Sequence, residues 1–286
     1  MRYYNIETGS FETEHRNWKI KILVWFQKCN IIPINCWIYQ FFAKFLTQWI
    51  LKADVPFVKD SEQEIREFCH EHGISTENWE WNKQINEYHT LNEFFMRRYS
   101  NLEFGNADVI SPATAVLSRF DNMPKNDIKG INYTYENCGI PNPDQYSKNE
   151  GYYLYLSPAD YHCFHSPIEG TICNIIDYRH LETYSGSVKP DILHIRPSVL
   201  TFNRRYIIVI ENANIKIAMV IIGGFLVDSI RIDSKIALGS AIAKGQFIGA
   251  FALGGSAILL LSTVSLNIPC VDFPVKYKVC QNFTEI

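Results

Sequence analysis

The sequence has no strong excess of charge, because 27 basic and 30 acidic residues leave a formal net charge of −3. Proteins that bind nucleic acid mainly through its phosphates are normally basic, so no nucleic-acid partner is expected. Glycine and proline are few, at 15 and 12 of 286 residues, which excludes collagen-like and low-complexity chains. A hydrophobic fraction of 47% instead predicts a folded chain with a sizeable core.

Other familiar signals are also missing. None of the eight cysteines forms a C-x-x-C pair, so neither a zinc ribbon nor a thioredoxin-like site is predicted. Scattered cysteines usually serve as small core residues, which makes a reducing, intracellular compartment the expectation. The start of the chain carries Glu7, Glu12 and Glu14, which argues against a targeting peptide. The longest uncharged run in the apolar stretch 18–51, residues 29–43, has 15 residues and contains Pro33, so it is too short to span a bilayer.

Part of that apolar stretch is amphipathic. Asn35 is a good N-cap for a helix that begins at Cys36. Polar residues then recur at helical spacing, and the remaining positions are largely aromatic or aliphatic: the polar stripe is Gln40, Lys44, Thr47 and Gln48. The pattern is typical of a helix that lies in a membrane surface, packs on the core, or contacts a second subunit in a homodimer.

The pattern of the whole chain predicts an α+β fold, with a helical region at 1–100 and a β-rich core at 101–286 that resembles a sandwich or barrel. Capping boxes begin two of the expected helices, at Ser61-x-x-Glu64 and Thr90-x-x-Glu93. Gly73 is suited to end the first helix, and LNEFFMRRY forms the second. Residues 121–150 are polar and are expected to form an exposed loop.

Short runs rich in β-branched and aromatic residues predict the strands of the core. Turn signals separate these runs, and no helix of crossover length is predicted between them. The runs are AVLSRF, YYLYL, GTICNII, RRYIIVIE, IKIAMVII and AILLLSTV.

Two clusters carry side chains suited to catalysis. The segment YLSPADYHCFHSPIEG places His162 and His165 three residues apart, close to Asp160. An acid/base pair, a metal pair and two structural histidines all fit this spacing, but the sequence marks no third metal ligand, so no metal is predicted. Farther along, Gly255 and Ser256 lie in FALGGSAILLLS, just before an apolar strand. A hydroxyl after such a peptide can attack the preceding carbonyl, although a glycine bulge has the same pattern.

Together, these segments resemble the phosphatidylserine decarboxylases, a family of pyruvoyl enzymes that cut themselves. LNEFFMRRY is similar to the family's L-N-x-F-F-x-R segment, and VISPATAV to its S-P-x-D-G segment. YLSPADYHCFHSPIEG resembles its Y-L-x-P-x-D-Y-H-x-x-H-x-P-x-x-G signature, and GGS its cleavage motif. The resemblance covers most of the chain after about residue 60.

The resemblance implies a specific chemistry. Ser256 would attack the carbonyl of Gly255, which leads to chain cleavage and converts Ser256 into a pyruvoyl group. The ketone would condense with the amine of phosphatidylserine and draw electrons as CO₂ leaves, giving phosphatidylethanolamine. By position in the motif, His162 would protonate the resulting carbanion, and His165 would be the base that activates Ser256. A lipid substrate implies a peripheral membrane protein.

One position departs from the family pattern. Thr114 stands where the family has the aspartate of the Ser-His-Asp arrangement. Threonine accepts a hydrogen bond but carries no charge, and loss of such an aspartate slows catalysis by orders of magnitude. Two alternatives therefore stand beside the lipid decarboxylase: an unprocessed paralogue that acts as a binding protein, and a decarboxylase of a soluble amino acid.

Overall fold

The computed structural model describes residues 2–14, 61–76, 79–120, 135, 138–146, 151–178, 204–223, 230–253, 256–266, 268 and 274–283. The amphipathic segment predicted from Cys36 lies outside these residues, as do Gly254 and Gly255. Within the described residues, no helix is both long and apolar enough to cross a membrane.

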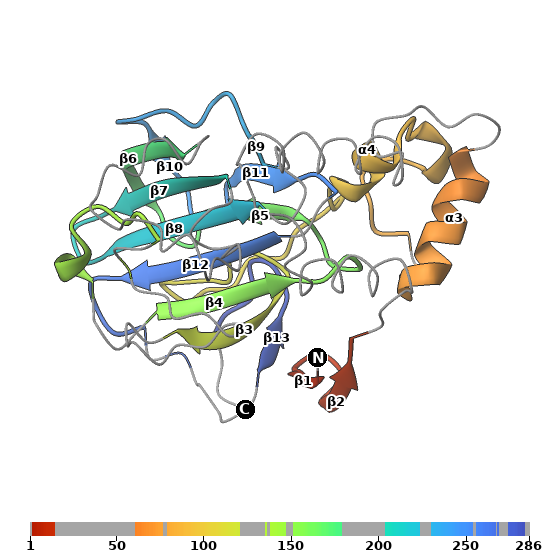
Figure 1. Ribbon diagram of the computed structural model, residues 1–286, viewed down its shortest axis with the longest axis horizontal. Coiled ribbons are helices and arrows are strands. Elements are labelled where there is room, and N and C mark those ends of the chain that lie inside the picture. Colours follow the sequence, from red (N-terminus) through yellow and green to blue (C-terminus); the bar gives the residue numbers. More distant parts are fainter. Residues whose placement is uncertain are drawn as a thin grey trace, which may run out of the picture.

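Strands dominate the described structure (Figure 1). Two α-helices are present, α3 (Ser61–His72) and α4 (Leu91–Phe95), with short 3₁₀ helices at Ile85–Glu87 and Pro143–Gln145. The strands are β1 (Arg2–Asn5), β2 (Ser10–Thr13), β3 (Ala115–Phe120), β4 (Gly151–Leu156), β5 (Cys163–His165), β6 (Gly170–Tyr178), β7 (Arg205–Glu211), β8 (Lys216–Gly223), β9 (Ile230–Ile232), β10 (Ala241–Ile242), β11 (Phe247–Phe251), β12 (Ser256–Ser262) and β13 (Val275–Tyr277).

The strands form two sheets. The large sheet has ten strands in the order β10-β6-β7-β8-β12-β4-β3-β13-β1-β2, and the small one has three in the order β5-β11-β9. Every pairing is antiparallel except that of β1 with β13, which is parallel. The β-rich core predicted from the sequence is therefore confirmed.

Alternation along the central strands explains why their sequences are apolar throughout. On β12, Ile258 and Leu260 face one core, while Leu259 and Leu261 face another. The first core lies between the two sheets, because it also contains Phe164 of β5 together with Ile248 and Phe251 of β11. A strand buried on both faces loses the polar alternation of a half-exposed strand.

The second face of the sheet is covered by part of the segment that was expected to be an exposed loop. Tyr135, Cys138, Ile140 and Tyr146 are buried there against β7, β8 and β12. For these residues the loop prediction was wrong. Their apolar side chains are spaced irregularly among polar ones, so the segment has no strand or helix periodicity that would have indicated burial.

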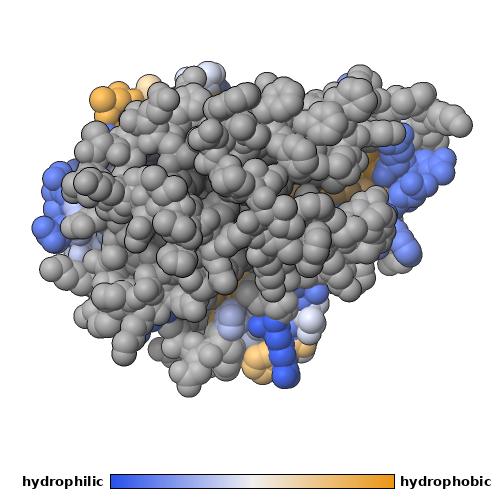
Figure 2. All heavy atoms as spheres, in the orientation of Figure 1, coloured by the Kyte–Doolittle hydropathy of each residue, from blue (hydrophilic) through white to orange (hydrophobic). Residues whose placement is uncertain are grey.

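The predicted helices are confirmed in part. Thr90 accepts a hydrogen bond from the Glu93 N–H (3.1 Å) and caps α4, while Gly73 follows α3 at φ +69°. The α4 helix ends at Phe95, and Tyr99 instead pairs with Trp81 in an isolated bridge. Hydrophilic side chains cover the outer surface of α3, at the right of Figure 2.

The first residues of the chain do not form a helix, so the prediction of a helical N-terminal region was wrong for this segment. β1 and β2 form an antiparallel hairpin that joins the large sheet through β13. Gly9 makes the turn at φ +63°, a backbone conformation in which glycine carries no steric cost. Tyr3 of β1 is buried, so this hairpin contributes to the core.

Candidate active site

Ser256 is the first residue of β12, where it pairs with Leu156 of β4 and Gly223 of β8. By strand alternation its side chain faces the same way as Ile258, into the space between the two sheets. The residue is only 5% exposed, and its Oγ has no hydrogen-bond partner among the described residues. A buried hydroxyl without a partner is costly, which makes Ser256 a candidate for a functional role.

His162 approaches the segment that leads to Ser256. Its carbonyl accepts the N–H of Phe251 (2.8 Å), and its ring lies against the ring of Phe95, with centroids 3.8 Å apart. It precedes Phe164, a residue of the core between the sheets, by two positions. Ser256 thus faces the space between the two sheets, and His162 bonds the segment that leads to it.

The two nitrogens of the His162 ring have different surroundings. Nδ1 lies 2.8 Å from the carbonyl oxygen of Asp160, and since a carbonyl only accepts, Nδ1 carries the proton. Nε2 is then the unprotonated nitrogen, and it is buried with no partner in the part of the chain that is described. Burial first, and then the nearby Arg97 guanidinium, lower the pKa of His162 to about 3. The ring is neutral at pH 7, with a basic nitrogen available.

Both ring nitrogens of His165 are occupied. Nδ1 donates to the carbonyl of Gly245 (2.8 Å), and Nε2 accepts from the hydroxyl of Tyr161 (3.0 Å). His165 alternates with Phe164 and shares its side of β5 with Cys163, which packs in a different cluster from the core between the sheets. Burial lowers the pKa of His165 to about 4, so this ring is neutral too.

Thr114 is buried immediately before β3. Its hydroxyl accepts a hydrogen bond from the N–H of Val279 (3.1 Å). Since the His165 nitrogens are bonded to Gly245 and Tyr161, the described contacts do not join Ser256, His165 and Thr114 into a triad. Ser256, His162, His165 and Thr114 are all buried, and of these four only Ser256 and His162 have a side-chain polar atom without a partner among the described residues.

The helix α4 holds both the histidine and the cleavage segment. The Oδ1 of Asn92 accepts the N–H of Leu253 (2.7 Å), three residues before Ser256. Leu253 also packs against the cluster that contains Phe94 and Phe95. The sequence does not predict this role for Asn92, because a side chain that bonds a backbone group 161 residues away leaves no local signal.

Arg97 holds the loop before His162. It is almost fully buried, and its Nη2 donates to the carbonyls of Ala159 (3.0 Å) and Asp160 (3.2 Å). A guanidinium is suited to this task because it presents several donors in a fixed plane. The loop is thus tied to α4, whose Phe95 ring also contacts His162.

Comparison with known proteins supports a relationship with enzymes. The family model described as phosphatidylserine decarboxylase matches residues 91–278, about two thirds of the chain. The chain belongs to the phosphatidylserine decarboxylase family. The matched range contains α4, both histidines, Thr114 and Ser256, so every predicted site residue lies within the part that defines the family.

Relatives in this family are similar over most of their length. The phosphatidylserine decarboxylase proenzyme of Clostridium tetani is 29% identical over 273 residues, which cover 91% of this chain and 87% of the relative. The proenzyme of Fusobacterium nucleatum is 28% identical over 229 residues, which cover 76% of this chain and 73% of the relative. The proenzyme of Chlamydia muridarum is 26% identical over 271 residues, which cover 91% of this chain and 86% of the relative.

A cleft of about 400 Å³ lies beside α4 and strands β9 and β11 of the small sheet. Its charged lining is mostly basic, with four cations and two carboxylates: Lys83, Arg97, Arg98, Arg231, Glu93 and Asp233. Lys83 pairs with Glu93, and the Arg98 guanidinium lies 3.6 Å from the centre of the Phe247 ring. In a decarboxylase of this family, such a cleft is suited to an anionic part of a substrate. No group of three or more side chains placed to bind a metal occurs among the described residues.

Proposed function

We propose that this chain is a phosphatidylserine decarboxylase synthesised as a proenzyme that cleaves itself between Gly255 and Ser256. Family membership supports the decarboxylase activity, and the relatives' names include the word proenzyme. The observation that carries the proposal is that Ser256 Oγ and His162 Nε2 are both buried and both without a hydrogen-bond partner among the described residues. One is a nucleophile that needs a base, and the other is a free base.

Self-cleavage starts from this pair. Ser256 Oγ gives its proton to His162 Nε2 and attacks the Gly255 carbonyl, so a C–O bond forms. As the C–N bond breaks, His162 returns the proton to the departing Ser256 nitrogen, and the amide becomes an ester with a free amine. Elimination then releases the Gly255 carboxylate and leaves a dehydroalanine, whose hydrolysis yields the pyruvoyl ketone and ammonia. The products are chains 1–255 and 256–286.

The resemblance assigns the role of base to His165, but the contacts favour His162. An acceptor nitrogen already bonded to a hydroxyl, as His165 Nε2 is to Tyr161, must lose that bond before it takes a proton. His162 Nε2 has no such bond to lose within the described part of the chain. We therefore propose His162 for this step and His165 for a structural role in β5.

The surroundings of Ser256 fit a pyruvoyl group. The group forms from this residue itself, in a buried position where Oγ has no competing partner. When present, it supplies an electron-withdrawing carbonyl for loss of CO₂ from an amino acid. His162 is the side chain suited to protonate the substrate carbon, as the sequence also predicts, because its low pKa makes an imidazolium at this position a strong acid.

The proposal includes a lipid substrate and a peripheral membrane location. The mostly basic cleft beside α4 is suited to the phosphate of an anionic phospholipid. The amphipathic segment from Cys36, which lies outside the described residues, supplies a surface for the membrane or for a second copy of the chain. Thr114 favours a second candidate function, an uncleaved binding protein that lacks the family's charged residue.

Intact-mass measurement of the purified chain tests the proposal. We expect two chains that correspond to 1–255 and 256–286, with the smaller one blocked by a carbonyl that hydrazine traps. Ser256→Ala should stay whole, whereas Ser262→Ala, another buried serine of the same strand, should be cleaved. A single species of 33.1 kDa without a trapped carbonyl contradicts the proposal. CO₂ release from phosphatidylserine vesicles, compared with free serine, identifies the substrate.

A further inference from the structure

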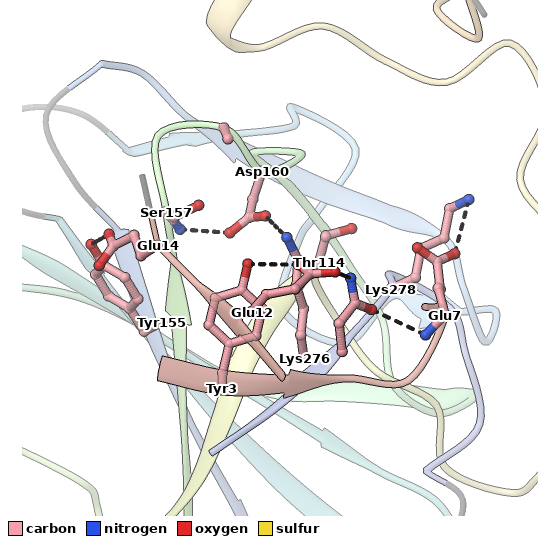
Figure 3. Close-up of polar contacts among 12 residues, drawn as sticks. Tyr3, Glu7, Glu12, Glu14, Thr114, Tyr155, Ser157, Asp160, Lys276 and Lys278 are labelled. Carbon is pink, nitrogen blue, oxygen red and sulfur yellow. Dashed lines mark hydrogen bonds and ion pairs between the residues drawn. The ribbon is translucent and has the colours of Figure 1, made fainter. Parts of the chain in front are cut away.

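A buried ion pair lies next to the loop that carries His162. Lys276 of β13 places its Nζ 2.7 Å from Asp160 Oδ1, and the two side chains are 21% and 2% exposed. The other carboxylate oxygen, Oδ2, accepts the N–H of Ser157 (2.7 Å). Both oxygens of Asp160 are therefore engaged, one by the loop itself and one by a strand from the end of the sequence (Figure 3).

The main chain of Asp160 bonds the catalytic histidine. Its carbonyl accepts the Nδ1–H of His162 (2.8 Å) and also lies 3.2 Å from Nη2 of Arg97. One residue thus links the Lys276 ammonium, through its side chain, to the His162 ring, through its backbone. Because a backbone carbonyl can only accept, its position determines which ring nitrogen carries the proton.

The N-terminal hairpin encloses the lysine. The Lys276 Nζ lies 5.5 Å from the centre of the Tyr3 ring, and the Tyr3 hydroxyl donates to Glu12 (3.2 Å). Burial lowers the pKa of Lys276, but the Asp160 carboxylate together with Tyr3 and Glu12 outweighs this effect, and the net shift is upward. Lys276 therefore remains charged, and Tyr3 of the hairpin lies beside it (Figure 3).

We propose that Lys276 is a positioning residue for His162: it fixes Asp160, whose carbonyl keeps the His162 proton on Nδ1 and leaves Nε2 as the free base. This role rests on the proposed function, in which His162 Nε2 carries the proton delivered to the substrate carbon during turnover. Lys276 lies after the predicted cut and Asp160 before it, so in the mature enzyme the ion pair joins the two chains.

Lys276→Met tests this role, with Lys278→Met as its matched control. Lys278 is two residues along and also pairs with a carboxylate, but its partner Glu7 is exposed and 3.5 Å away. We expect Lys276→Met to reduce kcat about tenfold to a hundredfold with KM within about twofold, because misplacement by about 1 Å can cost that much. Lys276→Arg should recover most of the rate, and Lys278→Met should match the wild type.

The His162 tautomer gives a measurement that does not depend on activity. In protein with ¹⁵N-labelled histidine, we expect wild-type His162 to show one protonated nitrogen, Nδ1, and Lys276→Met to show a mixture of tautomers. A single Nδ1–H tautomer in Lys276→Met, together with unchanged kcat, overturns the proposal. If the wild type is neither cleaved nor active, the proposed function fails, while the tautomer comparison still tests the link from Lys276 to His162.

A double variant separates positioning from folding. Lys276→Met alone leaves a buried carboxylate unpaired and can impair folding for that reason. Lys276→Met with Asp160→Asn removes both charges, so thermal stability should return toward that of the wild type. If kcat stays low in this folded double variant, the ion pair acts on His162. If kcat returns together with stability, the pair is only structural and the inference is wrong.

Discussion

The histidines of the site differ in what their rings already bind, and this difference leads to opposite expectations for their variants. His162→Ala removes the free Nε2 and should slow cleavage at Gly255–Ser256 by about 10²-fold to 10⁴-fold, the usual range for a general base. His165→Gln keeps hydrogen-bonding groups in place of the ring contacts with Gly245 and Tyr161 and should change the rate much less. The fraction of cleaved chain over time, measured on denaturing gels, compares them. Normal cleavage in His162→Ala would return the role of base to His165.

Thr114 is the position where this chain departs from the family motif. The sequence alone predicts that Thr114→Asp speeds slow cleavage, because an aspartate orients a histidine base. The contacts lead to another expectation: a carboxylate at residue 114 can still accept the Val279 N–H, but the His165 nitrogens are engaged elsewhere. We therefore expect the rate of cleavage to change less than about threefold. A time course of the purified variant measures this, and a large acceleration would show that a Ser-His-Asp arrangement operates.

The short strands around the site are the elements that the sequence predicts least well. The strands β7, β8 and β12 are predictable because both of their faces are buried, which makes long apolar runs. β5 and β9 have three residues each, and β10 has two, so their local sequence carries no period and their pairing partners define them. The hairpin of β1 and β2 was missed for a similar reason, since each strand has only four residues.

The residues of the site also differ in how well the sequence predicts them. Ser256, His162 and His165 were found because they belong to continuous motifs. Asn92 and Lys276 act through contacts with residues far away in the sequence, Leu253 and Asp160 respectively. Their chemistry depends on the fold, because neither residue has a distinctive neighbour in its own segment.

The basic cleft lies where α4 meets the small sheet. A variant of Arg98 tests whether this cleft binds the substrate phosphate. Arg98→Ala removes a cation that lies over Phe247 and lines the cleft. For vesicles of phosphatidylserine we expect KM to rise about tenfold to a hundredfold with kcat nearly unchanged, because a lost charge-assisted contact weakens binding by about 1.5–3 kcal/mol. Arg66→Ala, which removes an exposed arginine of α3, is the control. Equal KM values in the two variants would exclude this cleft as the phosphate site.

At the scale of the whole molecule, the strand order would hold the products of the proposed cleavage together. β12 lies between β4 and β8, and β13 between β3 and β1, so residues 256–286 pair with strands on the other side of the cut. We expect both chains to co-elute in size-exclusion chromatography and to separate only in denaturant, since several kcal/mol of buried apolar contact opposes release. Loss of the small chain from the native protein would contradict this strand order.

The two neutral histidines make the stability of the whole molecule dependent on pH. Their pKa values in the folded chain, about 3 for His162 and about 4 for His165, lie below the ordinary value near 6.5. Between pH 6.5 and 4 the unfolded chain binds more protons, so the free energy of unfolding falls as pH falls, by up to about 1.4 kcal/mol per pH unit for each histidine. Urea unfolding at pH 7 and pH 5 measures this. His162→Gln should remove about half of the histidine contribution, and an unchanged slope would show that His162 is not held neutral.

The strand order also determines when the chain can first react. β3 and β4 are translated early, yet their sheet is continuous only after β12 and β13 have emerged from the ribosome and entered between older strands. Lys276, which we infer to set the proton on His162, arrives with the last of these strands. A nascent chain that stops short of β13 has Ser256 but lacks Lys276, so the proposed conversion would wait until synthesis has passed this strand.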